Sequence, residues 1–387
     1  MTRKPLLMLP GPTSVPERIM KAMSQPIISH RGTEFRELYG ELLEGLKYPF
    51  QTKSDVFPLT CSGSGGVECI VSNAVSREDH VIVPTYGVFS ERMREEVVRC
   101  GGIPIDLPVK WGEACTAEQV KESLDNHPRT CAVAMVYNET STGVTARELP
   151  QIGRLCRERD ILLLVDAVSA LAGDTLKVDD WGIDLCVTGS QKCLAMPPGL
   201  SLVSVNSNAY SAIEKNRHKS FYFDLISQRD YARRQETPNT PALNLLYALK
   251  EAIAMLREEG LVKRIRRHKI CANALYTAFE NLGLQCFAEK RFRSQTVLAI
   301  NGPVGISEEK FREKLKKKHG VAVASGMGKL HGKAFRVGCM GIISGRDVLR
   351  TIQAVAKSLA DMRGLSSQKQ TYAIDSAKVI LARLNPA

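Results

Sequence analysis

Short apolar runs alternate with amphipathic stretches between residues 56 and 205. Their spacing predicts strands at 56–60, 81–84, 103–107, 132–137, 161–165, 185–188 and 202–205. Amphipathic patterns between several of these runs predict helices, for example at 90–99, 117–126 and 148–159. Strands that alternate with helices in this way are typical of a parallel sheet covered by helices. The sequence therefore predicts an α/β fold with a mainly parallel sheet of seven strands.

A second, smaller unit is expected after this region. A helical pattern runs from 242 to about 260 and on to 282, and further patterns predict strands at 285–287, 296–300, 321–324 and 335–337 and helices at 308–318 and 346–362. Residues 366–386 are polar and then amphipathic, which predicts a final helix packed on this unit. A chain of 387 residues is long enough for more than one domain. We expect an N-terminal arm (1–20), a large domain (21–260) and a small α+β C-terminal domain with a helical tail (261–387).

Composition argues against several classes of protein. No apolar run is long enough to cross a bilayer, and residues 1–10 lack the apolar core of a signal peptide. The eleven cysteines are an odd number, and none are spaced Cys-x-x-Cys. This pattern argues against a disulfide framework or a metal site, and residues such as Cys69 and Cys186 are expected in the core. We expect no membrane partner, no bound metal and a cytoplasmic location, where cysteines stay reduced.

The net charge of +12 comes partly from two basic clusters, 263–269 and 314–319. A basic chain can bind nucleic acid, but a basic patch carries little meaning without a recognised motif. Both clusters fall in helical patterns and lack interleaved aromatic residues. We expect them to be solvated faces, with no nucleic-acid partner, and the charge to attract anionic substrates.

One lysine stands out because it follows a buried strand. Lys192 comes after the apolar run 183–187 and shortly before the turn Pro197-Pro198-Gly199. Lysine is seldom buried without a partner, and a desolvated amine with a lowered pKa forms Schiff bases well. The alternative is a lysine at a strand end whose amine reaches the solvent. Taken alone, the segment leaves both interpretations open.

Two further segments fit a cofactor site. Asp166 ends the apolar run 161–165, and the carboxyl ends of parallel strands line the ligand crevice of such sheets. Its carboxylate could cap the next helix or pair with a pyridinium nitrogen. Residues 62–66, Ser-Gly-Ser-Gly-Gly, precede a helix expected at about 66–76, whose first N–H groups could bind a phosphate. Glu68 could instead close a capping box there.

The chain resembles the fold-type I, class V aminotransferases that depend on pyridoxal phosphate (PLP), in particular the alanine/serine–glyoxylate group. The matching segments follow the order of the family and cover most of the chain: 9–16, 62–65, 139–144, 164–169, 189–192, 197–199 and 332–338. The most specific of them is Gly189-Ser190-Gln191-Lys192 followed by Pro197-Pro198-Gly199.

This resemblance assigns most of the cofactor contacts. It implies that Lys192 binds PLP through a Schiff base and then transfers protons, and that Asp166 pairs with the pyridine nitrogen. Other implied contacts are Ser64, Gly65, Gly66 and Gln191 at the phosphate, Phe89, Thr140 and Val168 at the ring, and Thr240 reaching the phosphate from the neighbouring subunit of a homodimer. Phe89 replaces a frequent Trp of the family, and it could equally be a core residue. The aromatic residue that the family commonly has near Thr237 or Asn239 is missing.

Two arginines are assigned to the substrate. Arg336 matches the family residue that binds the α-carboxylate, for which the planar guanidinium is well suited. Arg31 lies where the family's N-terminal segment lines the substrate channel. It could bind a second acidic group of the substrate, or form a structural ion pair with Glu34 or Glu37.

These assignments predict a PLP-dependent aminotransferase that moves an amino group from alanine or serine to glyoxylate or pyruvate. An aminotransferase for aspartate or another acidic amino acid is the alternative within the family. A lyase such as a desulfurase is a second alternative, and it would need a mobile cysteine, for which Cys339 is the nearest candidate although it looks bound to a strand. A binding protein on a retired enzyme fold is a third alternative, and intact Lys192, Asp166 and Arg336 argue against it.

Overall fold

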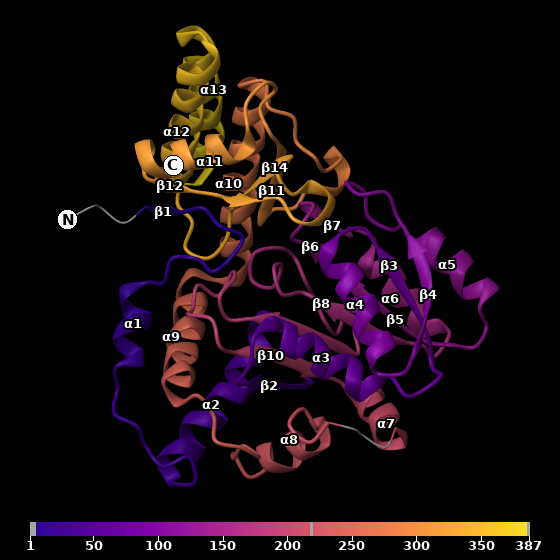
Figure 1. Cartoon of the computed structure of the whole chain (residues 1–387). Coiled ribbons are helices and arrows are strands. Elements are labelled where there is room, and N and C mark those ends of the chain that lie inside the picture. The colour runs from indigo at the N-terminus through magenta and orange to yellow at the C-terminus, as the bar shows by residue number, and fades with distance from the viewer. Residues whose placement is uncertain (1–4, 217–219, 385–387) are drawn as a thin grey trace.

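The structure is a computed structural model, and it describes residues 5–216 and 220–384. Figure 1 shows a large part with a central sheet and a smaller part above it. Two consecutive long helices, α9 (Leu243–Glu259) and α10 (Leu261–Asn281), lead from one part to the other. Gly260 separates them with a φ of 81°, a left-handed conformation that glycine adopts without strain.

The large part contains the predicted sheet of seven strands. Their spatial order is β2 (Asp55–Leu59), β10 (Ser201–Val205), β9 (Leu185–Gly189), β8 (Leu162–Asp166), β5 (Thr130–Val136), β3 (His80–Thr85) and β4 (Ile103–Pro108). Only β10 runs antiparallel to its neighbours in this sheet, and the other pairs are parallel. The prediction of a mainly parallel seven-stranded sheet is confirmed.

Helices cover both faces of this sheet because successive strand residues point to opposite sides. Val81 and Val83 of β3 pack with α3 (Gly63–Ala74), α4 (Val88–Arg99) and α7 (Ser207–Lys215). Ile82, between them, belongs to the opposite cluster, which includes α2 (Thr33–Phe50), α5 (Ala117–Asn126), α6 (Leu149–Glu158) and α9. The remaining helices of this part are α1 (Glu17–Met23), which packs on α9, and α8 (Leu225–Ala232).

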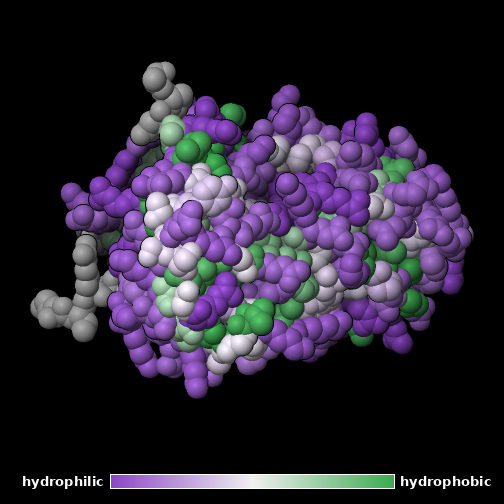
Figure 2. Space-filling model, turned by 90° about the horizontal axis from the view of Figure 1, so that it is seen from above, coloured by the Kyte–Doolittle hydropathy of each residue, from purple (hydrophilic) through white to green (hydrophobic). Residues whose placement is uncertain are grey.

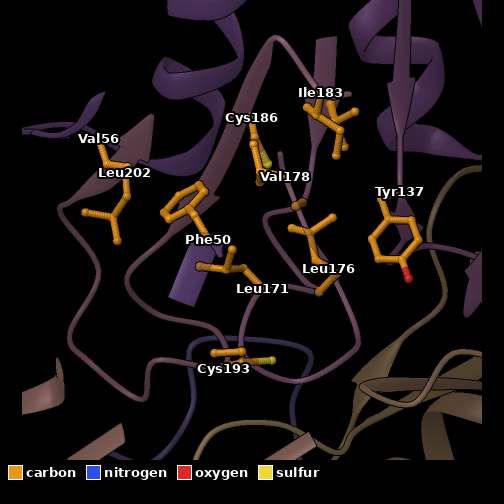
Figure 3. Close-up of a cluster of buried hydrophobic side chains, with 14 of the residues drawn as sticks. Phe50, Val56, Tyr137, Leu171, Leu176, Val178, Ile183, Cys186, Cys193 and Leu202 are labelled. Atoms are coloured by element: carbon orange, nitrogen blue, oxygen red, sulfur yellow. The ribbon is translucent and has the colours of Figure 1, made fainter. Parts of the chain in front are cut away.

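Part of this second cluster comes from neighbouring strands of the sheet and from the loop after β9. Figure 3 shows Val56, Cys186 and Leu202, from three neighbouring strands, together with Phe50 at the end of α2. Cys193, which directly follows Lys192, belongs to the same cluster and is 1% exposed. The backbone around Lys192 is therefore anchored in the core.

The smaller part is built on a three-stranded antiparallel sheet. Its strands, in spatial order, are β11 (Val297–Asn301), β14 (Ala334–Gly338) and β13 (Ala324–Ser325). Its helices, besides α10, are α11 (Glu308–His319), α12 (Gly345–Arg363) and α13 (Ser367–Leu381), and short 3-10 turns occur at Lys290–Phe292, Gly328–Leu330 and Ala382–Leu384. The tail helix α13 packs on α10 and α12 as predicted, and residues 385–387 lie outside the described residues.

One predicted strand is wrong. Residues 285–287 form only an isolated bridge, between Cys286 and Ile300. Two backbone hydrogen bonds join this segment to β11, and then Glu289 N–H donates to the carbonyl of Gly112, so the chain turns away from the sheet. The contact with β11 is too short for a strand.

The N-terminal arm packs on the smaller part, as Figure 1 shows. Strand β1 (Leu6–Leu7) pairs in parallel with β12 (Val321–Ala322). A small hairpin of β6 (Asn138–Glu139) and β7 (Val144–Thr145) follows β5 in the large part. Residues 1–4, the first part of the predicted arm, lie outside the described residues. The predicted domain boundaries themselves stay a prediction.

The surface is largely hydrophilic in the view from above, where apolar residues form small separate groups (Figure 2). No helix within residues 5–216 and 220–384 is long and apolar enough to cross a membrane. Both basic clusters lie in helices, 263–269 in α10 and 314–319 in α11. The prediction of solvated faces is wrong for two members of the first cluster, because Arg264 and His268 are only 3% and 0% exposed.

Candidate active site

The strand ends of the large sheet form a pocket of about 410 Å³. It lies at the carboxyl ends of β2, β5, β8 and β9, where ligands bind in open α/β sheets. The residues predicted from the sequence that line it are Ser64, Phe89, Thr140, Asp166, Val168, Gln191 and Lys192. The fold therefore brings into one pocket residues as far apart in the sequence as Ser64 and Lys192, which are separated by 128 positions.

A closed loop positions Lys192 just after β9. Ser190 N–H donates to the Leu200 carbonyl over 2.9 Å, and the Ser190 hydroxyl donates to the Pro197 carbonyl over 2.7 Å. These bonds tie the start of the loop to the Pro-Pro-Gly turn. The Lys192 amine donates to the carbonyl of Pro10 in the N-terminal arm. Burial, and secondarily the charge of Arg336, lower the pKa of Lys192 to about 8, although Asp166 partly opposes this.

Asp166 is the last residue of β8, and 7% of it is exposed. One carboxylate oxygen, Oδ1, accepts a hydrogen bond from Val168 N–H at 2.8 Å. Burial raises the pKa of Asp166 to about 7, against the smaller opposing effects of that bond and of Lys192. A buried carboxylate whose pKa is raised in this way is stabilised in its charged form when a cation lies beside it.

The Ser/Gly turn leads into α3, which begins at Gly63 and not at Gly66 as predicted. The first three N–H groups of the helix, those of Gly63, Ser64 and Gly65, have no partner within the helix and are available to an anion. Gly66 N–H already donates to the Ser62 carbonyl. The prediction that Gly66 binds the phosphate therefore needs correction.

Gly66 has a packing role instead. A Cβ atom at this position would lie 1.9 Å from the Ser201 hydroxyl oxygen and 2.5 Å from a Val187 methyl carbon. Only glycine allows α3 to pack so closely on β9 and β10. Glu68 lies in the second turn of α3, and N-cap Ser62 makes no side-chain capping bond, so the alternative of a capping box at Glu68 is wrong.

Phe89 lies in the first turn of α4 and lines the pocket while half-buried. The buried carboxylate of Glu139 accepts hydrogen bonds from the N–H groups of Phe89 and Ser90, at 3.1 and 2.9 Å. It also accepts the Ser141 hydroxyl at 2.6 Å. Glu139 thus fixes the start of α4 and, through it, the phenylalanine ring. The guanidinium of Arg92 lies 5.1 Å above the centre of that ring.

Polar side chains form another part of the pocket wall. The Thr140 hydroxyl donates to Ser169 Oγ at 2.8 Å, and Asn138 Nδ2 donates to the same oxygen at 2.7 Å. Val168 contacts the start of α3, because a Cβ at Gly63 would lie 3.0 Å from its methyl carbon. Gln191 Oε1 is buried and has no hydrogen-bond partner among the described residues. An unsatisfied buried oxygen in a pocket wall suits a site that receives a polar ligand.

Arg336 reaches the edge of the pocket from the smaller part. It lies in the middle of β14 with 8% of its surface exposed. Its Nε donates to the Ser325 carbonyl at 2.9 Å, and its Nη1 donates to the Thr140 carbonyl at 3.2 Å. Burial lowers the pKa of Arg336 to about 10, with Glu139 opposing. These two bonds use two of the five guanidinium N–H groups, so further donors are left for a carboxylate.

Arg31 and Thr240 lie apart from this pocket within one chain. The guanidinium of Arg31 donates to the carbonyls of Thr237 and Pro238, at 2.6 and 3.3 Å. Its acidic partner is Glu236, 3.6 Å away, so the expectation of an ion pair with Glu34 or Glu37 is wrong. The 237–240 segment is far from Arg31 in the sequence, but the fold places it next to the Arg31 guanidinium, which donates its hydrogen bonds to this segment. Thr240 is exposed.

Comparison with known proteins identifies the family. The family model described as Aminotransferase class-V matches residues 6–334.

This chain belongs to the class V aminotransferases.

The aminotransferase has relatives of similar length. It is 40% identical to an uncharacterised aminotransferase of Methanocaldococcus jannaschii over 98% of both chains. It is 34% identical to the serine–glyoxylate aminotransferase of Methylorubrum extorquens over 93% of both chains. Among solved structures, the ureidoglycine–glyoxylate aminotransferase of Bacillus subtilis aligns with a TM-score of 0.91 and 32% identity, covering 98% of both chains. The predicted family, fold and enzyme class are confirmed.

Several residues of this aminotransferase site were not predicted from the sequence, and four of them bear on its chemistry. Asn138 and Arg92 line the pocket, Glu139 fixes α4, and the carbonyl of Pro10 binds Lys192. A signal existed for Glu139, because a carboxylate that directly follows a strongly apolar strand needs buried partners. Pro10 lies in the matching segment 9–16, but its part in the site, a backbone carbonyl, has no side-chain signal.

Proposed function

We propose that this aminotransferase binds PLP in the pocket described above, with Lys192 as its covalent attachment point and Asp166 beside the ring nitrogen. The observation that carries this proposal is the arrangement of Lys192 and Asp166. Lys192 follows β9 and Asp166 ends the adjacent parallel strand β8, and both line one pocket together with the start of α3. The cation of a pyridinium ring would supply the partner that the buried Asp166 carboxylate lacks, and a phosphate would meet the free N–H groups of Gly63, Ser64 and Gly65.

Each side chain then has a distinct task. PLP, when bound, acts as the electron sink that weakens the bonds at the amino acid's Cα. Lys192, with its pKa lowered to about 8, is partly neutral near neutral pH, so its amine can take a proton and return it. Asp166 stays ionised beside the cationic nitrogen. Phe89 covers one face of the ring, and its backbone is held by Glu139.

Arg336 is proposed to bind the α-carboxylate of the substrate. Its guanidinium is already oriented by two backbone carbonyls, so little side-chain freedom remains to be lost on binding. A planar fork can hold a carboxylate through two parallel hydrogen bonds, which orients the amino acid. We propose alanine or serine as the donor and glyoxylate or pyruvate as the acceptor. Support comes from the serine–glyoxylate and ureidoglycine–glyoxylate relatives and from the single buried arginine at this pocket.

A donor with two carboxylates, such as aspartate, is the second candidate. The observation in its favour is Arg92, which is exposed and lines the pocket, while Arg336 contacts the carbonyl of Thr140, another lining residue. Arg31 would join it only from a neighbouring subunit. If Arg31 binds a distal carboxylate, Arg31→Ala should lower kcat/KM for aspartate far more than for alanine. If kcat/KM falls equally or only slightly for both substrates, Arg31 has a structural role, through its bonds with the Thr237 and Pro238 carbonyls.

A desulfurase activity is less well supported. Cys339 directly follows β14, is fully buried, and its thiol lies 3.7 Å from the His268 carbonyl. A cysteine held in this way does not supply the mobile thiol that the reaction requires. Sulfide release from cysteine would contradict this assignment.

We propose that the active form is a homodimer in the reducing cytoplasm. Thr240 is exposed and outside its own chain's pocket, so a contribution to a phosphate site requires a second chain. Phe221 is 93% exposed, and Phe223, two residues later, approaches Gly65 at the start of α3. An exposed aromatic residue beside the pocket is suited to contact with a second copy. No disulfide joins cysteines within residues 5–216 and 220–384, which agrees with a reducing compartment.

The decisive experiment is a half-reaction screen. Purified protein is loaded with PLP, each amino acid is added separately, and conversion to pyridoxamine phosphate is followed by absorbance. We expect alanine or serine to convert the cofactor fastest, and glyoxylate to reverse the conversion. Faster conversion by aspartate would overturn the donor assignment but not the aminotransferase activity. Absence of PLP absorbance and of any conversion would contradict the proposed cofactor site.

A further inference from the structure

The N-terminal arm is bound to the smaller part of the molecule by strand-like hydrogen bonds. Leu6 N–H donates to the Gly320 carbonyl, and Met8 N–H donates to the Ala322 carbonyl, each at 2.9 Å. Gly338 N–H at the end of β14 donates to the Met8 carbonyl at 2.8 Å. A Cβ at Gly338 would lie 1.9 Å from the Leu9 carbonyl oxygen, so the arm lies directly against this strand end. Residues 6–9 therefore have one defined position.

The next residues of the arm contact Lys192 and its neighbour. The Pro10 carbonyl accepts a hydrogen bond from the Lys192 amine. Thr13 N–H donates to the Gln191 carbonyl at 3.3 Å, and the Thr13 hydroxyl donates to the Lys192 carbonyl at 3.4 Å. The arm thus binds both the side chain and the backbone of the lysine.

Glycine is required between these contacts. Gly11 has a φ of 102°, and a Cβ at this position would lie 2.7 Å from Lys192 Cδ and 2.9 Å from Lys192 Nζ. Any side chain at Gly11 would press on the lysine and move its amine away from the Pro10 carbonyl. The lysine has lost most of its contact with water, so its amine needs another hydrogen-bond partner.

We infer that the Pro10 carbonyl is the acceptor that holds the Lys192 amine whenever the amine is not joined to the cofactor, and that Gly11 is present because only glycine allows this approach. Pro10 is a positioning residue that acts through Lys192. The inference rests on the proposed function, in which the amine must leave the cofactor in the first half-reaction and return to it in the second. The arm also contacts Gly338, which lies two residues after Arg336 in the same strand. It therefore connects the strand of the carboxylate-binding arginine with the lysine.

The first test measures the reactivity of Lys192 in the cofactor-free full chain. Wild type, Gly11→Ala and the control Gly101→Ala are pulsed with acetic anhydride across a pH series, and acetylation of Lys192 is measured by peptide mass spectrometry. Gly101 also has a positive φ, of 87°, but a Cβ there would meet its nearest atoms at 3.6 Å, an ordinary contact. The control therefore reproduces the backbone strain without pressure on the lysine.

The expected result follows from the hydrogen bond. A carbonyl acceptor favours the charged amine, so its loss lowers the pKa of Lys192 further and increases the neutral, reactive fraction. Lys192 of Gly11→Ala should be acetylated about fivefold faster than in wild type and the control at pH 7, the effect of losing roughly one hydrogen bond. Equal rates in all three proteins would overturn the inference.

The second test does not depend on the folding of Gly11→Ala. Amide hydrogen exchange is compared between cofactor-free wild type and Lys192→Ala. Removal of the amine should speed exchange in the 9–14 segment several-fold, while the 5–8 segment, held by its pairing with the smaller part, stays unchanged as an internal control. Unchanged exchange in residues 9–14 would overturn the inference.

A third measurement separates this inference from the proposed function. PLP-loaded wild type is treated with borohydride, and the modified residue is identified. If Lys192 is not labelled, the proposed function fails. If Lys192 is labelled but Gly11→Ala behaves like Gly101→Ala in the first test, the role of the arm is refuted while the proposed function stands.

Discussion

At the scale of single residues, burial acts on Lys192 and Asp166 in opposite directions. It lowers the pKa of the amine to about 8 and raises that of the carboxyl to about 7, because a dry environment disfavours the charged form of both groups. Both groups are therefore close to their titration points near neutral pH. The cationic nitrogen of a bound cofactor would pair with the ionised form of Asp166. Its aldehyde would react with the neutral form of Lys192.

The first prediction concerns Lys192→Ala. No other lysine lines the pocket in the described part of the chain, so the variant should lose transamination and the covalent cofactor bond. The measurement is single-turnover conversion of the loaded protein. Turnover within about tenfold of wild type, which corresponds to about 1.4 kcal/mol in the barrier, would contradict the role of this lysine.

A second prediction concerns Asp166→Asn in the cofactor-free protein. The pKa of Asp166 is higher in the folded than in the unfolded state, so the unfolded state loses the proton first and the fold loses stability as pH rises from about 4 to about 7. Asparagine does not ionise. The stability of the variant relative to wild type should therefore increase between pH 5 and pH 7, by up to about 3 kcal/mol, and level off above pH 7.

This effect is measured by urea unfolding of cofactor-free protein at several pH values. Asp180→Asn serves as the control, because the Asp180 side chain is 67% exposed. If the stability of Asp166→Asn changes with pH in the same way as that of wild type, then Asp166 does not ionise between pH 5 and pH 7.

At the scale of elements, the site depends on how closely α3 packs on the sheet. Gly66→Ala would place a methyl group against Ser201 and Val187, at 1.9 and 2.5 Å. We expect it to destabilise the protein by about 1–3 kcal/mol through overpacking and to weaken PLP binding, because the start of α3 must shift. Chemical denaturation and PLP titration measure the two effects.

The matched control is Gly45→Ala in α2, also a helical glycine. A Cβ there would meet its nearest atom, a methyl carbon of Ile253, at 3.4 Å. Its higher helix propensity should offset any strain, so a change within about 1 kcal/mol is expected. Equal effects of the two substitutions would show that the packing of α3 is not tight.

At the scale of the whole molecule, the proposed site combines a pocket of the large part with Arg336 of the smaller part and, as proposed, Thr240 of a second chain. Thr240→Ala should weaken PLP binding about tenfold or more, as expected for a hydrogen bond to a charged group, without a change in assembly. The exposed Ser367→Ala in α13 should leave binding unchanged. Light scattering at the assay concentration should show a dimer, and a fully active monomer would refute the shared site.

Much of the architecture could be predicted from local patterns. The seven strands of the large sheet were located from apolar runs, because a buried parallel strand must be apolar on both faces. The strand predicted at 285–287 is wrong because the apolar character of a segment does not determine how far it pairs with a neighbouring strand. The start of α3 was placed three residues late because glycines obscure where a helix begins.

The sequence by itself determined the elements of the large sheet and the family, since these follow from local hydrophobic patterns and short motifs, and the family resemblance then made Lys192, Asp166 and Arg336 the candidate site residues. Only the tertiary structure decided which groups meet. It showed that Gly66 packs against the sheet, that Arg31 pairs with Glu236, and that a backbone carbonyl of the N-terminal arm reaches the Lys192 amine. The physical reason is that backbone carbonyls and close approaches of glycine have no side-chain signature, so their partners are set by long-range packing.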